Sequence, residues 1–292
     1  MLPYTKLNPH SRGDGNYAPH KPLLLLSILD MAESGEISSS RLEKTPGLRL
    51  RFDAYWAIVQ ARWGGLPGLD QPFHYLRSQG FWSTFTQDGH ISTADRSTVY
   101  VELDPQFMAD LSSAQRRDEA RRILVEKWFT EAEQRALYAA FGWSSAKLRQ
   151  IEWSDQANED AEATGRDANF RIKVVTQYRF TCALTGYGLH TAQGHSLVEA
   201  AHIHAFSKSR NNSPDNGLAL TRDAHWMFDK GLWTLDEQQR VLVAKEIFTE
   251  WGPETDWLRK RHQQPAYFNE GTQLRPAEAR LHWHRKHVFN SI

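Results

Sequence analysis

Cysteine is almost absent from this chain of 292 residues, and neither sign of charge predominates. Because Cys182 is the only cysteine, no intramolecular disulfide and no Cys-x-x-Cys zinc site can form. A lone thiol fits a reducing compartment, and we interpret this one as a small buried side chain. The 35 basic residues balance 35 acidic ones, so any contact with a polyanion must come from local patches of charge.

Long apolar runs are missing as well. No segment has 18 consecutive apolar residues, and the N-terminus shows no basic stretch followed by an apolar one. We therefore expect a soluble, cytoplasmic protein. The stretch 152–169 holds six acidic residues and few apolar ones, a composition typical of linkers. Since 292 residues suffice for two cores, we predict domains over 1–150 and 170–292, joined by an acidic linker at 151–169.

The first domain shows mainly helical patterns. Residues 20–37 read as a helix that ends near Gly35, and four consecutive leucines place it inside a core. Apolar residues recur at spacings of three and four over 48–63, which indicates a second helix. A strand is expected at 98–103 and helices over most of 105–142. We therefore predict an α+β chain with a mainly helical N-terminal domain.

The second domain contains a compact series of patterns over 197–244. They predict a strand at 197–203, a polar loop, a short strand at 218–221, a helix at 222–230 and then a hairpin. Thr221 is the expected N-cap of that helix.

Three residues of this series are spaced for one site: His202 on the first strand, Asn216 where the loop ends and His225 on the helix. Hydrolysis of a phosphodiester needs a base to activate water and a cation to neutralise the leaving oxygen. A neutral imidazole can be the base, and a second imidazole can bind a divalent metal that acts as a Lewis acid. An asparagine amide donates and accepts at once, so it can pin the loop.

Around these residues the chain resembles the HNH endonucleases of bacterial restriction-type proteins, which have the ββα-metal fold. The resemblance covers about 170–245 and is carried by the motifs AAHI at 200–203, DNGLAL at 215–220 and HWMFDKG at 225–231. It implies a metal-dependent endonuclease that acts on double-stranded DNA with Mg²⁺ or Mn²⁺. His202 would be the general base, Asn216 would orient the loop, and His225 would bind the metal.

One departure from that family concerns the metal. Many relatives carry an aspartate just before the first histidine as a second ligand, and here that position is Ala201. Glu199, on the same strand face as Ala201, or Asp229, one helical turn after His225, can replace it. Each is equally compatible with a solvated or supporting carboxylate, so both interpretations stay open.

The last predicted helix, 277–289, is basic and carries three histidines. Metal binding by His282, His284 and His287 is one interpretation. We favour a surface helix that covers the nuclease core or touches phosphate.

The first domain resembles the sulfur-binding domains of type IV, modification-dependent restriction enzymes. The motifs are APHKPLLLL at 18–26 and the pattern PFxxLxxxGFW at 72–82. The resemblance implies recognition of phosphorothioate DNA, in which sulfur replaces a non-bridging phosphate oxygen. An apolar cup for the sulfur would be lined by Pro72, Phe73 and Tyr75. The DNA contacts would come from Arg12, His20, Lys21 and Arg96. Relatives usually have tyrosine before the proline, where this chain has Gln71.

Together the two resemblances predict an endonuclease whose first domain reads a modification and whose second domain cuts. Two alternatives stay open: the mark is a methylated base rather than sulfur, or the chain binds DNA with an inactive nuclease domain. Since one HNH site cuts one strand, we expect a homodimer for a double-strand cut.

Overall fold

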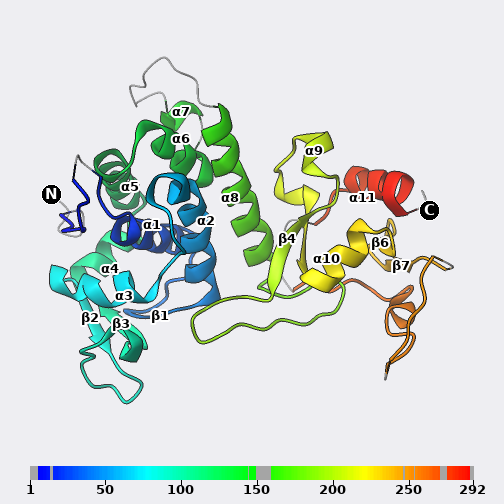
Figure 1. Cartoon of the computed structure of the whole chain (residues 1–292), viewed down its shortest axis with the longest axis horizontal. Helices are drawn as coiled ribbons and strands as arrows, with labels where there is room; N and C mark the ends of the chain where they lie inside the picture. Colours follow the sequence, from blue (N-terminus) through cyan, green and yellow to red (C-terminus); the bar gives the residue numbers. More distant parts are fainter. Residues whose placement is uncertain are drawn as a thin grey trace. The chain divides into compact units, whose positions relative to one another are not determined.

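The chain divides into two compact units. Unit 1 is Met1–Asn169 with Ala192–His195, and unit 2 is Phe170–Thr191 with Ser196–Ile292. Both units combine helices and strands, which confirms the α+β class (Figure 1). No helix within the described ranges is long and apolar enough to cross a membrane. The computed structural model describes residues 6–13, 16–143, 145–148, 159–245, 247–252, 254–269 and 275–289.

Unit 1 is built around helix α1 (His20–Glu33), whose four consecutive leucines are all fully buried, as predicted. The helix ends four residues before the predicted end at residue 37, because Gly35 takes a left-handed φ of 73°. It packs against helices α2 (Pro46–Trp63) and α5 (Ala114–Trp128). Further helices of this unit are α4 (Pro105–Ser112), α6 (Glu131–Ala140) and α7 (Ser145–Leu148).

A small antiparallel sheet completes unit 1. Its order is β1-β3-β2, with β1 (Arg41–Glu43), β2 (Trp82–Phe85) and β3 (Tyr100–Leu103). The aromatic stretch that carries the PFxxLxxxGFW pattern forms the helix α3 (Asp70–Tyr75) and the 3₁₀ turn η2 (Leu76–Gln79), and then enters β2. A second 3₁₀ turn, η3 (Asp95–Ser97), lies against α3.

The predicted linker is wrong over the residues that can be compared. Residues 151–158 lie outside the described part of the chain, but 159–169 form the first half of a helix, α8 (Glu159–Gln177). This half packs tightly on α6, because a Cβ at Gly165 would lie 2.0 Å from Ala136 O. The acidic composition suits an amphipathic helix as well as a linker, since a carboxylate such as Glu162 pairs with Arg166 one turn later.

Unit 2 is organised around an antiparallel pair, β4 (Val198–His202) and β5 (Gly217–Thr221), followed directly by α10 (Arg222–Asp229). These match the predicted strand, strand and helix within two residues at each end. Thr221 stands at the N-cap position, but its hydroxyl makes no capping hydrogen bond and lies 3.7 Å from Cys182 Sγ instead. The other elements are α9 (Phe206–Ser209), η4 (Pro214–Asn216), β6 (Trp233–Leu235), β7 (Val241–Val243), η5 (Arg259–Arg261), α11 (Glu278–His284) and the π-helix η6 (Arg285–Phe289).

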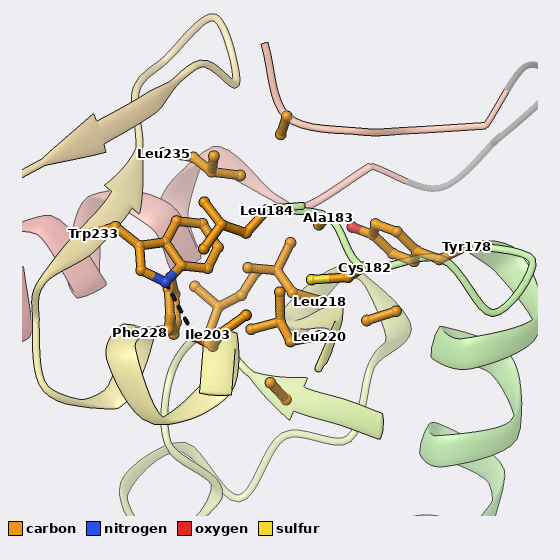
Figure 2. Packing of buried hydrophobic residues seen from close by; sticks show 14 of the residues in the cluster. Tyr178, Cys182, Ala183, Leu184, Ile203, Leu218, Leu220, Phe228, Trp233 and Leu235 are labelled. Carbon is orange, nitrogen blue, oxygen red and sulfur yellow. Dashed lines mark hydrogen bonds between the residues drawn. The ribbon is translucent and has the colours of Figure 1, made fainter. Parts of the chain in front are cut away.

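The core of unit 2 contains buried residues of α8, β4, β5, α10, β6, β7 and α11. Figure 2 shows Tyr178 and Cys182 at one end of the cluster, Leu218 and Leu220 of β5 in the middle, and Trp233 at the other end. The indole nitrogen of Trp233 donates to Ala224 O at 3.0 Å, so the core ties α10 to the β6–β7 hairpin (dashed line in Figure 2). Burial of the only cysteine agrees with the sequence interpretation.

His284 attaches the tail helix α11 to this core. Its ring stacks on Phe228 with centroids 3.7 Å apart, Nε2 donates to Phe228 O at 3.2 Å, and Nδ1 accepts from Thr234 Oγ1 at 2.9 Å. Both ring nitrogens are therefore used within the core, so His284 is a packing residue and not a metal ligand. Burial lowers the pKa of His284 to about 4, although the bond to Phe228 O opposes the shift.

This burial predicts a loss of stability in mild acid. The folded pKa of about 4 lies below the ordinary value of 6.5, so the unfolded chain binds a proton in that window and the folded chain does not. As the pH falls from 6.5 to 4, the free energy of unfolding should drop by about 3 kcal/mol on account of this one side chain. Chemical denaturation of the wild type and His284→Gln at pH 7 and pH 4.5 measures the difference. An equal acid sensitivity of both proteins would contradict the assignment.

Candidate active site

The β4–β5 pair places His202 at the end of β4, directly opposite Gly217. Cross-strand partners share a face, and this face lies against α8. The His202 ring stacks on Phe170 with centroids 3.9 Å apart and planes 6° apart. A Cβ on Gly217 would lie 2.4 Å from Val174 Cγ2, so only glycine allows the hairpin to approach α8 this closely.

The His202 imidazole is held by a second residue that sequence reasoning missed. Nε2 lies 2.8 Å from Asn212 Oδ1 in the loop between the strands. Because an amide oxygen can only accept, Nε2 carries the proton in this pair and the basic lone pair is on Nδ1. In this tautomer Nδ1 is the nitrogen that can accept a proton. The run Arg210-Asn211-Asn212 was visible in the sequence, but nothing in it marked which amide would reach the ring.

Asn216 is fully buried and fastens the loop through its side chain. Its Oδ1 accepts from His204 N at 2.9 Å, and its Nδ2 donates to His204 O at 3.0 Å and to Asn211 O at 3.1 Å. Its own carbonyl accepts from Ile203 N at 2.9 Å. The amide thus fixes the backbone just beyond His202 and the loop that carries Asn212.

His225 lies on α10 and contacts both carboxylates that the sequence singled out. Nδ1 donates to Glu199 Oε1 at 2.8 Å, and Nε2 lies 3.5 Å from Asp229 Oδ2. Glu199 and His202 stand three residues apart on β4 and therefore face opposite sides of the strand. The structure thus distributes the predicted residues over two hydrogen-bonded groups, one around His202 and Asn216 and one around His225.

The donor set around His225 fits a divalent ion held by few protein ligands. Nε2 of His225 and Oδ2 of Asp229 lie 3.5 Å apart, and an imidazole nitrogen beside a carboxylate oxygen is a pair of ligand atoms that a divalent cation can take. The bond from Nδ1 to Glu199 is the usual support for a metal-binding histidine. Mg²⁺ commonly takes one or two protein ligands and fills the rest with water and phosphate. Among the residues the structure describes, no group of three or more His, Cys, Asp or Glu side chains can hold a metal alone.

Ala201, which replaces the usual aspartate, is buried in the core of unit 2 opposite Leu218. A carboxylate at this position would have to leave water for an apolar environment. Glu199 is already the hydrogen-bond acceptor of His225, so Asp229 is the better placed of the two replacement ligands.

A separate hollow lies in unit 1 and has a volume of about 440 Å³. It gathers four of the residues predicted to contact modified DNA: His20, Lys21, Pro72 and Tyr75. Gln71, which departs from the family, also lines it. The remaining lining residues are Asn8, Pro9, His10, Ala18 and Ser78, and the first three of these precede both motifs.

Three of the residues predicted to contact the modified DNA do not line the hollow. Phe73 was expected in the cup but is fully buried, with its ring edge-on to Trp82 at 5.5 Å, because α3 turns this face toward the core. Arg12 lies flat on Trp63, 3.8 Å from the ring centroid, and donates to Trp63 O. Arg96 is exposed on η3 and does not line the hollow.

Burial lowers the pKa values of two residues that line the hollow, His20 and Lys21. Burial lowers the pKa of His20, and the positive charge of Arg12 lowers it further, so this imidazole is neutral at pH 7. Its ring also contacts Trp56, with centroids 4.6 Å apart. Burial lowers the pKa of Lys21 as well. The hollow therefore has a neutral aromatic wall beside a single ammonium group.

Comparisons with known proteins agree with the geometry of unit 2. Residues 182–236 match the family model of the HNH endonucleases, and this segment holds β4, β5, α10 and β6. No curated protein matches the chain. A solved structure described as "Modification dependent TagI restriction endonuclease" shares 18% identity with a TM-score of 0.34, and the match covers 42% of this chain and 38% of that one. The chain thus spans well under half of that protein, and so distant a likeness says nothing about its substrate.

The family match confirms the HNH resemblance. Residues 182–236 of unit 2 are therefore an HNH endonuclease domain. The resemblance of unit 1 to sulfur-binding domains stays a prediction.

The buried amide of Asn216 generates a test of stability. Asn216→Ala leaves an N–H and two carbonyls of the loop without partners, so we expect the free energy of unfolding to fall by about 3 kcal/mol. Asn212→Ala is the matched control, because that amide is only half-buried and we expect a loss below about 1 kcal/mol. Urea denaturation gives both values. Equal losses in the two variants would show that the amide of Asn216 does not hold the loop.

Proposed function

We propose that this protein is a modification-dependent DNA endonuclease in which unit 1 reads a phosphorothioate and the HNH domain of unit 2 cuts nearby. The observation that carries the proposal is the hollow of unit 1, where Pro72 and Tyr75 meet His20 and Lys21. It lies outside the segment that matches the HNH family, so the chain has a second candidate site besides the nuclease.

The chemistry of the hollow suits sulfur. Sulfur is larger, more polarizable and less hydrated than oxygen, so it loses little when it leaves water for the ring of Pro72 and the face of Tyr75. An ordinary phosphate oxygen in the same place would lose its hydrogen bonds to water without replacement. Specificity then comes from rejection of the common ligand. The neutral imidazole of His20 keeps this wall weakly polar.

The rim of the hollow supplies positive charge for the flanking phosphates. His20 and Lys21 begin α1, and the helix has no side-chain cap and no acidic residue in its first turn. Unpaired amides at a helix N-terminus attract phosphate, and the Lys21 ammonium adds a full charge.

In the nuclease domain we assign the general base to His202. Asn212 sets its tautomer and Phe170 fixes its plane, so the lone pair of Nδ1 can take a proton from the attacking water. His225 and Asp229 would hold the divalent ion, and Glu199 would orient the imidazole of His225. When bound, Mg²⁺ or Mn²⁺ supplies Lewis-acid stabilisation of the charge that develops on the phosphate oxygens.

A double-strand cut needs two such sites, because each hydrolyses one strand. The proposal therefore includes a twofold homodimer, the commonest arrangement of two identical chains.

The assignment of the base predicts that His202→Ala lowers the rate of cleavage by a factor of about 10² to 10⁴. DNA affinity should stay within about twofold, because a positioned base contributes to the transition state and not to ground-state binding. Nicking of supercoiled plasmid with Mg²⁺ or Mn²⁺ gives the rate, and fluorescence anisotropy in EDTA gives the affinity. His190→Ala, at an exposed histidine of the same unit, is the control and should cut normally. Full cutting by His202→Ala would remove the assignment.

The reading function predicts a preference that depends on the hollow. The full chain should bind DNA with one phosphorothioate more tightly than the same sequence without it. Tyr75→Ala and Pro72→Ala should abolish that difference while the weak general affinity persists, because the charges at Lys21 remain. Tyr187→Ala removes a comparably exposed tyrosine from unit 2 and should keep the preference.

The measurement is the ratio of dissociation constants for the two DNAs across several sequence contexts around the sulfur. A ratio of one for the wild type in every context would reject sulfur as the mark. The same assay with methylated bases would then test the alternative mark.

A further inference from the structure

Unit 2 carries a column of stacked rings outside the groups assigned to catalysis. The rings of His204 and Trp283 stack with centroids 3.8 Å apart at 17°, and those of Trp283 and His287 stack at 5.0 Å and 18°. His204 follows His202 by two residues, Trp283 lies on α11 and His287 on η6. Segments far apart in the sequence therefore meet at this column.

Several basic side chains lie around this column of rings. Lys208 of α9 places Nζ 5.8 Å from the centre of the Trp283 ring, and Arg280 lies on α11 three residues before Trp283. Burial lowers the pKa of His204, and its electrostatic interactions with Arg280, His287 and Lys208 lower it further. We call the five residues His204, Lys208, Arg280, Trp283 and His287 the basic column.

The column is fixed by the same contacts that hold the catalytic loop. Asn216 bonds both the N–H and the carbonyl of His204, at 2.9 and 3.0 Å. Ala277 N donates to Asp215 O at 2.9 Å, which joins the start of α11 to the end of the loop. His287 Nδ1 donates to Trp283 O at 2.9 Å. The ring stack is therefore a built feature of the domain, in a defined position relative to His202.

The positive charges of Lys208 and Arg280 repel each other when their side chains converge, unless an anion lies between them. Nearby Arg285 does not add to this excess, because it is paired with Glu278. The two long cationic side chains of Lys208 and Arg280 offer N–H donors at several angles, which suits the oxygens of a phosphate. A metal ion would be repelled by the same charges.

We propose that the basic column binds the phosphate backbone of DNA beside the bond that the HNH site cleaves. His204 is two residues from the general base, so a phosphate held there flanks the bond that is attacked. Trp283 orients the imidazoles, while Lys208 and Arg280 supply charge. This inference rests on the nuclease assignment and is independent of sulfur recognition, which belongs to unit 1.

The test compares the full-length wild type with Lys208→Ala/Arg280→Ala on unmodified DNA. Binding is measured by anisotropy in EDTA over a range of salt concentrations, so no cleavage is involved. Each lost phosphate contact lowers the slope of log affinity against log salt by about 0.9, so the double variant should lose about 1 to 2 in slope and about tenfold in affinity. Cleavage under subsaturating DNA should fall by a similar factor.

The control removes the same charge elsewhere on unit 2. Lys173→Ala/Lys260→Ala takes away two exposed lysines and should change slope and affinity little. A wild-type slope and affinity in the first variant would overturn the proposal, and so would equal losses in the two double variants. Thermal midpoints equal to that of the wild type exclude a folding defect. If the first variant is destabilised, Lys208→Ala and Arg280→Ala measured singly, each expected to lower the slope by about 1, decide instead.

A third readout separates this inference from the reading function. The ratio of affinities for phosphorothioate and plain DNA should be the same in the wild type and in Lys208→Ala/Arg280→Ala, because the hollow of unit 1 is untouched. A changed ratio would assign these residues to recognition of the mark and overturn a purely backbone role. A wild type with no preference would reject the sulfur proposal and leave the basic column to be decided by the salt slope.

Discussion

The architecture of the nuclease unit depends on one buried amide. Asn216 has no exposed surface, and its side chain bonds three backbone groups of the segment that follows β4. Leaving such groups unpaired in a core is costly, so the amide specifies a single path for this loop. That path presents Asn212 to His202 and sets the backbone from which His204 reaches Trp283. His202, the proposed general base, and the basic column are therefore positioned by the same side chain.

The positive charge of this protein is concentrated in local patches, because its basic and acidic residues balance over the whole chain. The chain as a whole is neutral. Lys21 nevertheless supplies a positive charge at the hollow of unit 1, and basic side chains cluster around Trp283 in unit 2. Some acidic residues are committed to internal pairs: Asp30 and Glu36 compensate the buried guanidinium of Arg51. A neutral protein with such patches should bind DNA weakly in general, so that specific contacts decide where it acts.

The sequence predictions were accurate where the signal is local. The four leucines of α1, the strands that became β4 and β5, and the helix carrying His225 follow from periodicity and turn residues within a few positions. The linker was wrong for residues 159–169, because its acidic composition does not reveal that Gly165 packs against Ala136. The resemblance to sulfur-binding domains placed Phe73 in the cup, but neighbouring residues on a short helix point in different directions, and Phe73 points into the core.

The sequence alone was enough to determine the HNH motif and its residues His202, Asn216 and His225, because their spacing is a local property of the chain. The tertiary structure decided the partners. Phe170 stacks on His202, and Asn212 forms a hydrogen bond with it. Glu199 accepts a hydrogen bond from His225 on the opposite side of the strand from His202, and Trp283 stacks on His204. Each of these contacts, apart from the one with Asn212, joins segments more than 20 residues apart. Local patterns carry no information on such distances, so only the packing of the whole domain selects among the possible partners.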